Sequence, residues 1–267
     1  MIIDIHAHAF PDALAKRALD SLLTLSEGKF PLYTDATVNG LLEYMDMCGI
    51  DKSVLQPIVT KEKQLVALNE WAISLKSDRI IPFGGIYPCA ADYRAAIDFV
   101  YGLGLRGLKL HPEYQNFVAD DPALLPVYDY ALSRGMTLLF HAGYDPAFKP
   151  PFRSSAKQFS NILDAMRGGT IILAHMGGHG EGEWVKTERY LCGRDVYFDT
   201  SMGFIYRPTE VFLSFVKNHG ADKILFGTDS PWSDASAEIR LLNEAPITEE
   251  QRGLIFSGNA KRLLGLE

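Results

Sequence analysis

Two histidines near the start of the chain, His6 and His8, have the type and spacing of metal ligands. They stand two residues apart in the run 2–8, whose β-branched isoleucines predict a buried strand. Because side chains alternate along a strand, both imidazoles project from the same face. Two such imidazoles can bind one divalent cation at about 2.0–2.1 Å from each nitrogen. The alternative is a pair of buried histidines with ordinary hydrogen bonds. The two residues alone do not distinguish this alternative from a metal site.

Later apolar runs end in residues of the same kind. These residues are Lys109, His111, His141, His175 and Asp229. Buried ionisable groups are rare unless they are paired or bound to metal, so a lysine and an aspartate in such places need charge partners. A divalent cation is one such partner. Imidazole and carboxylate are suitable ligands for zinc, and also for manganese, iron or nickel.

The apolar runs and the helical patterns between them predict the elements that must position these residues. Eight runs are strand candidates: 2–8, 53–57, 80–86, 107–111, 137–141, 170–175, 196–199 and 224–229. Helical patterns separate them, for example 122–134, for which Asp121 is the expected N-cap. Eight strand–helix repeats predict an α/β fold, a single-domain (β/α)8 TIM barrel over residues 1–267, with its active site at the C-terminal ends of the strands. A doubly wound sheet is the alternative, but it does not explain why there are eight strand–helix repeats.

Composition narrows the class of protein. The 267 residues are 47% hydrophobic and 22% charged, and a barrel of about 250 residues fits this length. A net charge of −7 without a lysine or arginine run argues against nucleic-acid or anionic-membrane partners. No apolar stretch of about 18 residues predicts a membrane span. The three cysteines have no CxxC spacing, and a strand expected from residue 2 leaves no room for a leader, so we predict a cytoplasmic protein.

The chain resembles the amidohydrolase superfamily over essentially its whole length. The resemblance rests on Asp-Ile-His-Ala-His at 4–8, Gly-Leu-Lys-Leu-His-Pro at 107–112, His141, His-Met-Gly-Gly at 175–178, Gly-Thr-Asp-Ser-Pro at 227–231 and the ending 258–264. The closer match is amidohydrolase family 2. That branch also contains decarboxylases similar to aminocarboxymuconate-semialdehyde decarboxylase.

The resemblance implies a role for each of these residues. It implies a single divalent ion, zinc first and manganese, iron or nickel as alternatives, with the ligand set His6, His8, His141 and Asp229. His175 matches the general acid/base, and it or Asp229 takes a proton from water. In two-metal members a strand-four lysine is carboxylated, and the strand-five and strand-six histidines hold the second ion. Lys109 stands in that strand; the alternative is a plain cation that pairs with a substrate carboxylate or with Asp229.

Loops beyond the strand ends are expected to select the substrate. The segment 144–155 is rich in proline and aromatic residues and carries Lys149 and Arg153, and Trp232 follows the last strand. We expect substrate contacts from His111, Arg153 and Trp232, although these residues would also serve simply to close the barrel mouth. His179 is a further candidate, whereas His219 is expected to cap a helix or to lie on the surface. Asp4 either orients a ligand or has a structural role, which we favour slightly.

The candidate residues and the resemblance leave three alternative functions. The first is a metal-dependent hydrolase that cleaves a C–N or C–O bond in a small, anionic substrate. The second is a metal-dependent decarboxylase of an aromatic or enoic acid. The third is a catalytically silent ligand-binding barrel, which gives no physical reason to keep so many buried polar groups together. The sequence leaves the oligomeric state open, with a homodimer as one alternative.

Overall fold

The strands form a closed barrel of parallel strands. The computed structural model describes residues 1–166, 168–180 and 182–266. Within them the strands pair in the order β1–β2–β3 and β4–β5–β6–β7–β8–β9, all parallel. Their bounds are β1 Ile3–Ala7, β2 Lys52–Leu55, β3 Ile80–Pro82, β4 Gly84–Gly85, β5 Gly107–Leu110, β6 Thr137–Phe140, β7 Ile171–Leu173, β8 Tyr197–Asp199 and β9 Ile224–Leu225.

Two features complete the eightfold arrangement. Only Phe83 separates β3 from β4, so these two short strands occupy one position in the barrel. At the other junction, the segment after β9 runs beside β1: Ile5 N–H donates to the Phe226 carbonyl over 2.9 Å, and Asp229 N–H donates to the His6 carbonyl over 2.8 Å. The predicted barrel with eight strand positions is therefore confirmed, and the doubly wound sheet is wrong.

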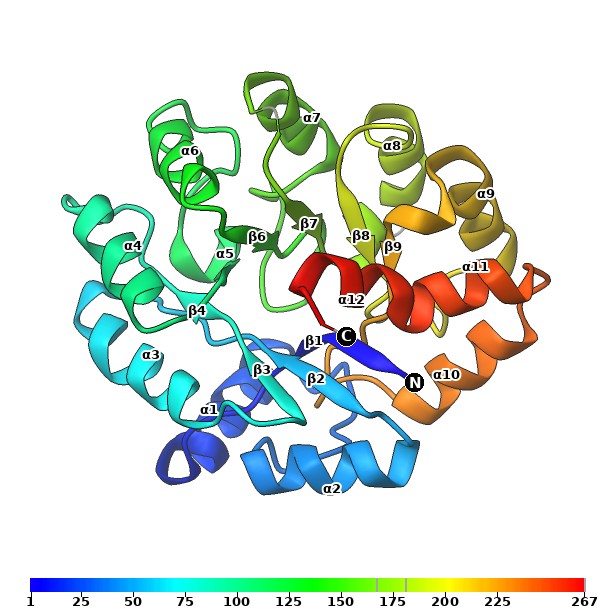
Figure 1. The fold of residues 1–267 in the computed structure, drawn as a ribbon, viewed down its shortest axis with the longest axis horizontal. Coiled ribbons are helices and arrows are strands. Elements are labelled where there is room, and N and C mark those ends of the chain that lie inside the picture. Colours follow the sequence, from blue (N-terminus) through cyan, green and yellow to red (C-terminus); the bar gives the residue numbers. More distant parts are fainter. Residues whose placement is uncertain (167, 181, 267) are drawn as a thin grey trace.

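Helices surround the strands on the outside (Figure 1). The α-helices are α1 Asp12–Leu25, α2 Val38–Cys48, α3 Leu65–Ser74, α4 Tyr93–Gly102, α5 Pro112–Gln115, α6 Leu125–Ser133, α7 Ala156–Ala165, α8 Glu183–Tyr190, α9 Thr209–His219, α10 Ala235–Glu244, α11 Glu249–Gly253 and α12 Asn259–Leu264. Short 3₁₀ turns lie at η1 Glu62–Gln64, η2 His175–Gly177 and η3 Ala221–Lys223, and a π-helical turn, η4 Leu254–Gly258, joins α11 to α12.

The helix prediction needs two corrections. Helices α1 and α5 were not expected. The N-cap of α6 is Leu124 rather than Asp121, because the Asp121 carboxylate accepts from Ala123 N–H and the chain makes one more turn before the helix begins.

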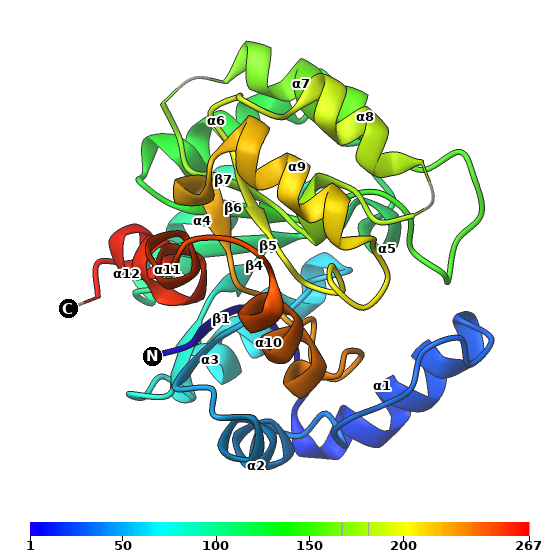
Figure 2. The same ribbon diagram turned by 90° about the vertical axis from the view of Figure 1, so that its right-hand side faces the viewer.

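The two ends of the barrel differ in what covers them. A core cluster draws buried side chains from several strands and from Ala260 of α12, with Leu263 and Leu264 packed against it. Figure 2 shows both chain termini, α11 and α12 at one end of the barrel, while α1 and α5 lie at the opposite end. The C-terminal ends of the strands thus lie at the end of the barrel where α1 and α5 are found. Among the described residues, no helix is both long and apolar enough to cross a membrane.

Candidate metal centre

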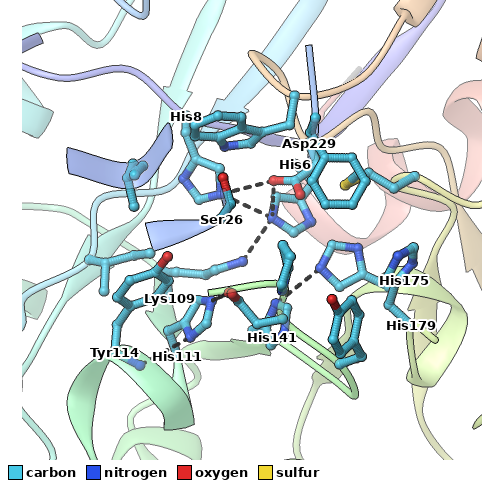
Figure 3. Close-up of a pocket in the computed structure, with 18 of the residues that line it drawn as sticks. His6, His8, Ser26, Lys109, His111, Tyr114, His141, His175, His179 and Asp229 are labelled. Carbon is cyan, nitrogen blue, oxygen red and sulfur yellow. Dashed lines mark hydrogen bonds and ion pairs between the residues drawn. The ribbon is translucent and has the colours of Figure 1, made fainter. Parts of the chain in front are cut away.

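A pocket at the C-terminal ends of the strands gathers the predicted site residues. Its volume is about 110 Å³, similar in scale to the ~150 Å³ cavity that takes one benzene ring. The side chains that line it include all seven residues singled out at strand ends: His6, His8, Lys109, His111, His141, His175 and Asp229 (Figure 3). Strands far apart in the sequence therefore present these groups to one space, as the barrel requires.

Three ligand atoms form a compact triangle within this pocket. His6 Nε2 lies 3.1 Å from His8 Nε2, and Asp229 Oδ1 lies 3.3 Å from His6 Nε2 and 3.2 Å from His8 Nε2. Two ligands at ~2.1 Å from one ion, with an angle of about 90–109° between them, stand ~3.0–3.4 Å apart. The three edges match this range, so the triangle has the dimensions of a face of a metal coordination shell.

The protonation of the two histidines favours a cation at this face. His8 Nδ1 lies 2.9 Å from the Gln56 carbonyl oxygen, which can only accept, so Nδ1 carries the proton. His6 Nδ1 lies 2.9 Å from Asp199 Oδ2 and is fixed in the same way. Both Nε2 atoms then present lone pairs toward the Asp229 carboxylate. Burial lowers the pKa of His6 well below its ordinary value, which keeps the imidazole neutral and able to bind metal.

Ser201 fixes two imidazoles at once. Its hydroxyl donates to Asp199 Oδ1, and its oxygen lies 3.0 Å from His6 Nδ1 and 2.9 Å from His175 Nδ1. Because one hydroxyl has one proton, the oxygen accepts from both rings, and each Nδ1 is protonated. The Ser201 carbonyl oxygen, 3.1 Å from His175 Nδ1, requires the same tautomer. The Nε2 atom of His175 is therefore the basic one.

Lys109 is the cation already beside the triangle. Its Nζ lies 2.8 Å from His6 Nε2, and the residue is 1% exposed. Burial lowers its pKa to about 8, while the charges of Asp229 and Asp199 oppose this shift. The ammonium partly fills the need of the three acceptors for positive charge.

His141 occupies the pocket without joining the triangle. Its Nδ1 lies 3.1 Å from His175 Nε2, and its ring stacks on His111 with centroids 4.1 Å apart. Together with His111 and Asp145 it forms a second group of three potential ligands. Its buried Nε2 has no hydrogen-bond partner among the described residues, so an acceptor there still needs a donor or an ion. The expected single set of four ligands is thus present as three converging atoms plus a neighbour.

The backbone at two site residues is unusual. His175 has φ 57° and Asp229 has φ 65°, both in the left-handed region that non-glycine residues seldom adopt. Such conformations persist where the surrounding structure fixes them, and they are common at functional sites.

Of the other residues singled out in the sequence, some line the pocket and some lie outside it. Trp232 and His179 line the pocket. Arg153 does not line the pocket: its guanidinium lies 2.8 Å from Glu113 Oε2 and also donates to Asn116. Asp4 is structural, because it accepts from the N–H groups of His6 and Thr228 and from the Thr228 hydroxyl. His219 lies at the end of α9, where its Nε2 contacts the Val196 carbonyl.

Several groups that matter here were missed in the sequence. They are Gln56, Asp145, Asp199 and Ser201. Asp199 had a usable signal, since it ends a predicted strand like the other site residues. Gln56 acts through its main-chain carbonyl, for which residue type gives no signal.

Comparisons with known proteins agree with this architecture. The family model described as amidohydrolase matches residues 3–266. An uncharacterised TIM-barrel protein from Bordetella bronchiseptica superposes with a TM-score of 0.78 at 20% identity, covering 99% of this chain and 98% of that one. No curated protein matches.

Two further structures connect the fold with reactions. A dihydroxybenzoic acid decarboxylase from Polaromonas, with bound manganese and the inhibitor 2-nitroresorcinol, gives a TM-score of 0.73 at 17% identity, covering 99% of this chain and 96% of that one. A candidate 2-pyrone-4,6-dicarboxylic acid hydrolase from Pseudomonas putida gives 0.69 at 17% identity, covering 100% and 98%. At these identities the likeness shows the fold alone.

Proposed function

Since the chain belongs to the amidohydrolase family, we propose that it is a metal-dependent hydrolase of a small carboxylate-bearing compound. The observation that carries this proposal is the triangle of His6 Nε2, His8 Nε2 and Asp229 Oδ1, which has three acceptors and no donor. These residues fit a divalent ion, and His141 lines the same pocket as a further imidazole. When bound, such an ion supplies Lewis acidity, which polarises a carbonyl group and makes water a stronger acid.

The residues of the chain supply the proton transfers. His175 presents a basic Nε2 to the pocket, because Ser201 holds its Nδ1 protonated. We propose that His175 accepts a proton from water and returns it to the leaving group, as a general base and then a general acid. Asp229 orients the attacking water. Lys109 places positive charge where a substrate carboxylate or a developing oxyanion would lie.

Decarboxylation is the second candidate, and Lys109 is the observation that favours it. A buried ammonium beside the triangle can hold the carboxylate that leaves as CO2. The neighbours of similar fold include decarboxylases of hydroxylated benzoates, one of them with bound manganese. That manganese supports a divalent metal here too; zinc and manganese both suit a site of imidazole and carboxylate ligands.

An isotope experiment separates the two reactions. Metal-loaded protein is incubated in oxygen-18 water with a panel of ring-bearing carboxylic acids and their lactones, esters and amides. A hydrolase incorporates the heavy oxygen into its product and releases no CO2. Stoichiometric CO2 without solvent oxygen in the organic product would replace hydrolysis by decarboxylation. Chelator-treated protein is the control and should be inactive in both assays.

A further inference from the structure

His179 lies where the metal pocket meets a second cavity. The metal pocket has a volume of about 110 Å³ and the second cavity about 510 Å³, and His179 lies in the wall of both, together with Tyr144 and Met202. The residue stands four positions after His175, and Figure 3 shows the two imidazoles next to each other. Their ring centroids are 5.8 Å apart. A second imidazole thus stands beside the proposed general base, with no part in the proposed proton transfers.

The main chain and the ring of His179 are both held in place. Its N–H donates to the Ala142 carbonyl over 3.1 Å, and its carbonyl accepts from Tyr144 N–H over 2.8 Å. The Tyr144 ring stacks with the imidazole, with 6.1 Å between the centroids and 21° between the planes. Phe30 and Tyr206 approach the imidazole at steep angles, with centroids at 6.5 and 6.0 Å. These aromatic contacts orient the ring without using its nitrogens.

The two ring nitrogens of His179 have no hydrogen-bond partner among the residues that the structure describes. Neither nitrogen is among the buried atoms that lack a partner, so both keep surface that is open to the pocket. The nitrogens of His175 are both used instead, Nδ1 by Ser201 and Nε2 by His141. Burial lowers the pKa of His179 to about 4, so its ring is neutral at pH 7. A neutral imidazole offers one donor and one acceptor.

We propose that His179 determines specificity by hydrogen-bonding an uncharged oxygen of the substrate, a carbonyl or hydroxyl group, on the His175 side of the pocket. This rests on the proposed function only in that the ligand of the metal pocket is a substrate. A neutral imidazole among aromatic rings offers no charge to an anionic group, so a carboxylate is better placed at Lys109 and an uncharged oxygen at His179. A compound without this oxygen leaves the polar groups of the imidazole unpaired, and it binds less tightly.

Acylation with diethyl pyrocarbonate tests this contact without any turnover. The reagent acylates a neutral imidazole at a free nitrogen, and peptide mass spectrometry of the metal-loaded protein identifies which histidines react. The internal reference is His219, whose nitrogens contact Gly193 N–H and the Val196 carbonyl. His179 should react at least ~10-fold faster, because a buried and bonded ring reacts only after local opening. Equal rates for the two histidines would overturn the proposal.

Protection from this reagent links His179 to the ligand. Each carboxylic acid, lactone, ester or amide of the panel that binds by calorimetry is added at about ten times its Kd, and it should slow the labelling of His179 about 10-fold. Binding that leaves His179 unprotected would overturn the proposal. Protection by a compound that is neither hydrolysed nor decarboxylated would support the contact and contradict the proposed function alone.

Variants at position 179 test the hydrogen bond itself. His179→Phe keeps an aromatic ring but removes both polar atoms, and it should raise the KM of the best substrate roughly 3–10-fold with little change in kcat. His179→Gln and His179→Asn each keep an amide, near the places of Nε2 and Nδ1, and one of them should restore most of the affinity. For a compound that binds without turnover, Kd is compared instead of KM. A wild-type value in His179→Phe, or a loss that neither amide restores, would overturn the proposal.

Discussion

At the scale of single residues, the site depends on groups that set the protonation of the ligands. Asp199 accepts from His6 Nδ1 and from the Ser201 hydroxyl, and Ser201 in turn accepts from His175. One carboxylate and one hydroxyl therefore determine which nitrogen of two different imidazoles faces the pocket. Mutation of outer partners of this kind typically lowers metal affinity or activity about 10–100-fold.

Asp199→Asn should weaken metal binding about 10–100-fold without unfolding the barrel. An amide can accept only on one side, so His6 loses the charged partner that makes it a good ligand. The measurement is a competitive titration of the metal against a chelator of known affinity. Asp195→Asn, a change at an exposed carboxylate four residues earlier, is the control and should have no effect. Unchanged affinity in Asp199→Asn would contradict the role of Asp199 in orienting His6 as a ligand.

His175→Asn should keep the metal and reduce turnover roughly 10²–10⁴-fold, because it removes the basic nitrogen but none of the triangle atoms. Metal content and kcat are measured on the same preparation. His219→Asn removes a buried histidine that lies at the end of α9 and should leave kcat unchanged. If His175→Asn loses metal instead, His175 is a ligand rather than an acid/base.

Sequence patterns predicted which side chains gather at the strand ends, but they did not predict most of the groups that hydrogen-bond to these side chains. His6, His8 and Asp229 converge as the strand alternation and the family resemblance implied. Arg153 lies outside the pocket and pairs with Glu113, 40 residues earlier, and that pairing depends on how α5 meets the loop 144–155.

At the scale of elements, loops rather than strands build the pocket walls. The segment after β6 touches the segment after β7 through an isolated bridge between Gly143 and His179. Helix α1 was not predicted, and only Ala15 and Leu19 of its fourteen residues are buried. Yet Leu22 and Ser26, at its C-terminal end, line the metal pocket. An element can therefore cover the site with few of its residues in the core.

Gly143→Ala should disrupt this wall. Gly143 has φ +83°, and an added Cβ would lie 2.4 Å from His179 N and 2.6 Å from His179 O, which are main-chain atoms that cannot move aside easily. We expect a loss of stability at least ~2 kcal/mol larger than for Gly135→Ala, together with reduced activity. Gly135 has a similar φ of +74° with open space around its Cβ position. Gly135→Ala therefore measures the cost of the backbone strain alone, without the clash between the added Cβ and His179. Equal denaturation midpoints for the two variants would contradict the contact.

At the scale of the whole molecule, buried ionisable groups link stability to pH. Glu238 on α10 lies beneath the loop after β8, and burial raises its pKa from 4.5 to about 8. The folded protein then binds more protons than the unfolded chain between these two values. The contribution of Glu238 to the free energy of unfolding therefore falls as pH rises from about 4.5 to about 8.

Glu238→Gln should remove this part of the pH dependence. The amide can still accept from Phe204 N–H and donate to Ser233, while it cannot ionise. Urea denaturation at pH 5.5 and 8.5 should show a smaller loss of stability in the variant, by on the order of 1 kcal/mol or more. Glu244→Gln, at an exposed position of the same helix, should behave like the wild type. Parallel pH profiles for wild type and Glu238→Gln would rule out the raised pKa.

The metal content of the purified protein tests the central claim most directly. Elemental analysis of wild type that has never met a chelator should find ~1 equivalent of a divalent transition metal per chain, as three converging ligands imply. Asp229→Ala should lose most of that metal while its circular dichroism stays that of the folded barrel, because residues at this face contribute little to the core. Wild type without metal, or Asp229→Ala with a full equivalent, would contradict the account.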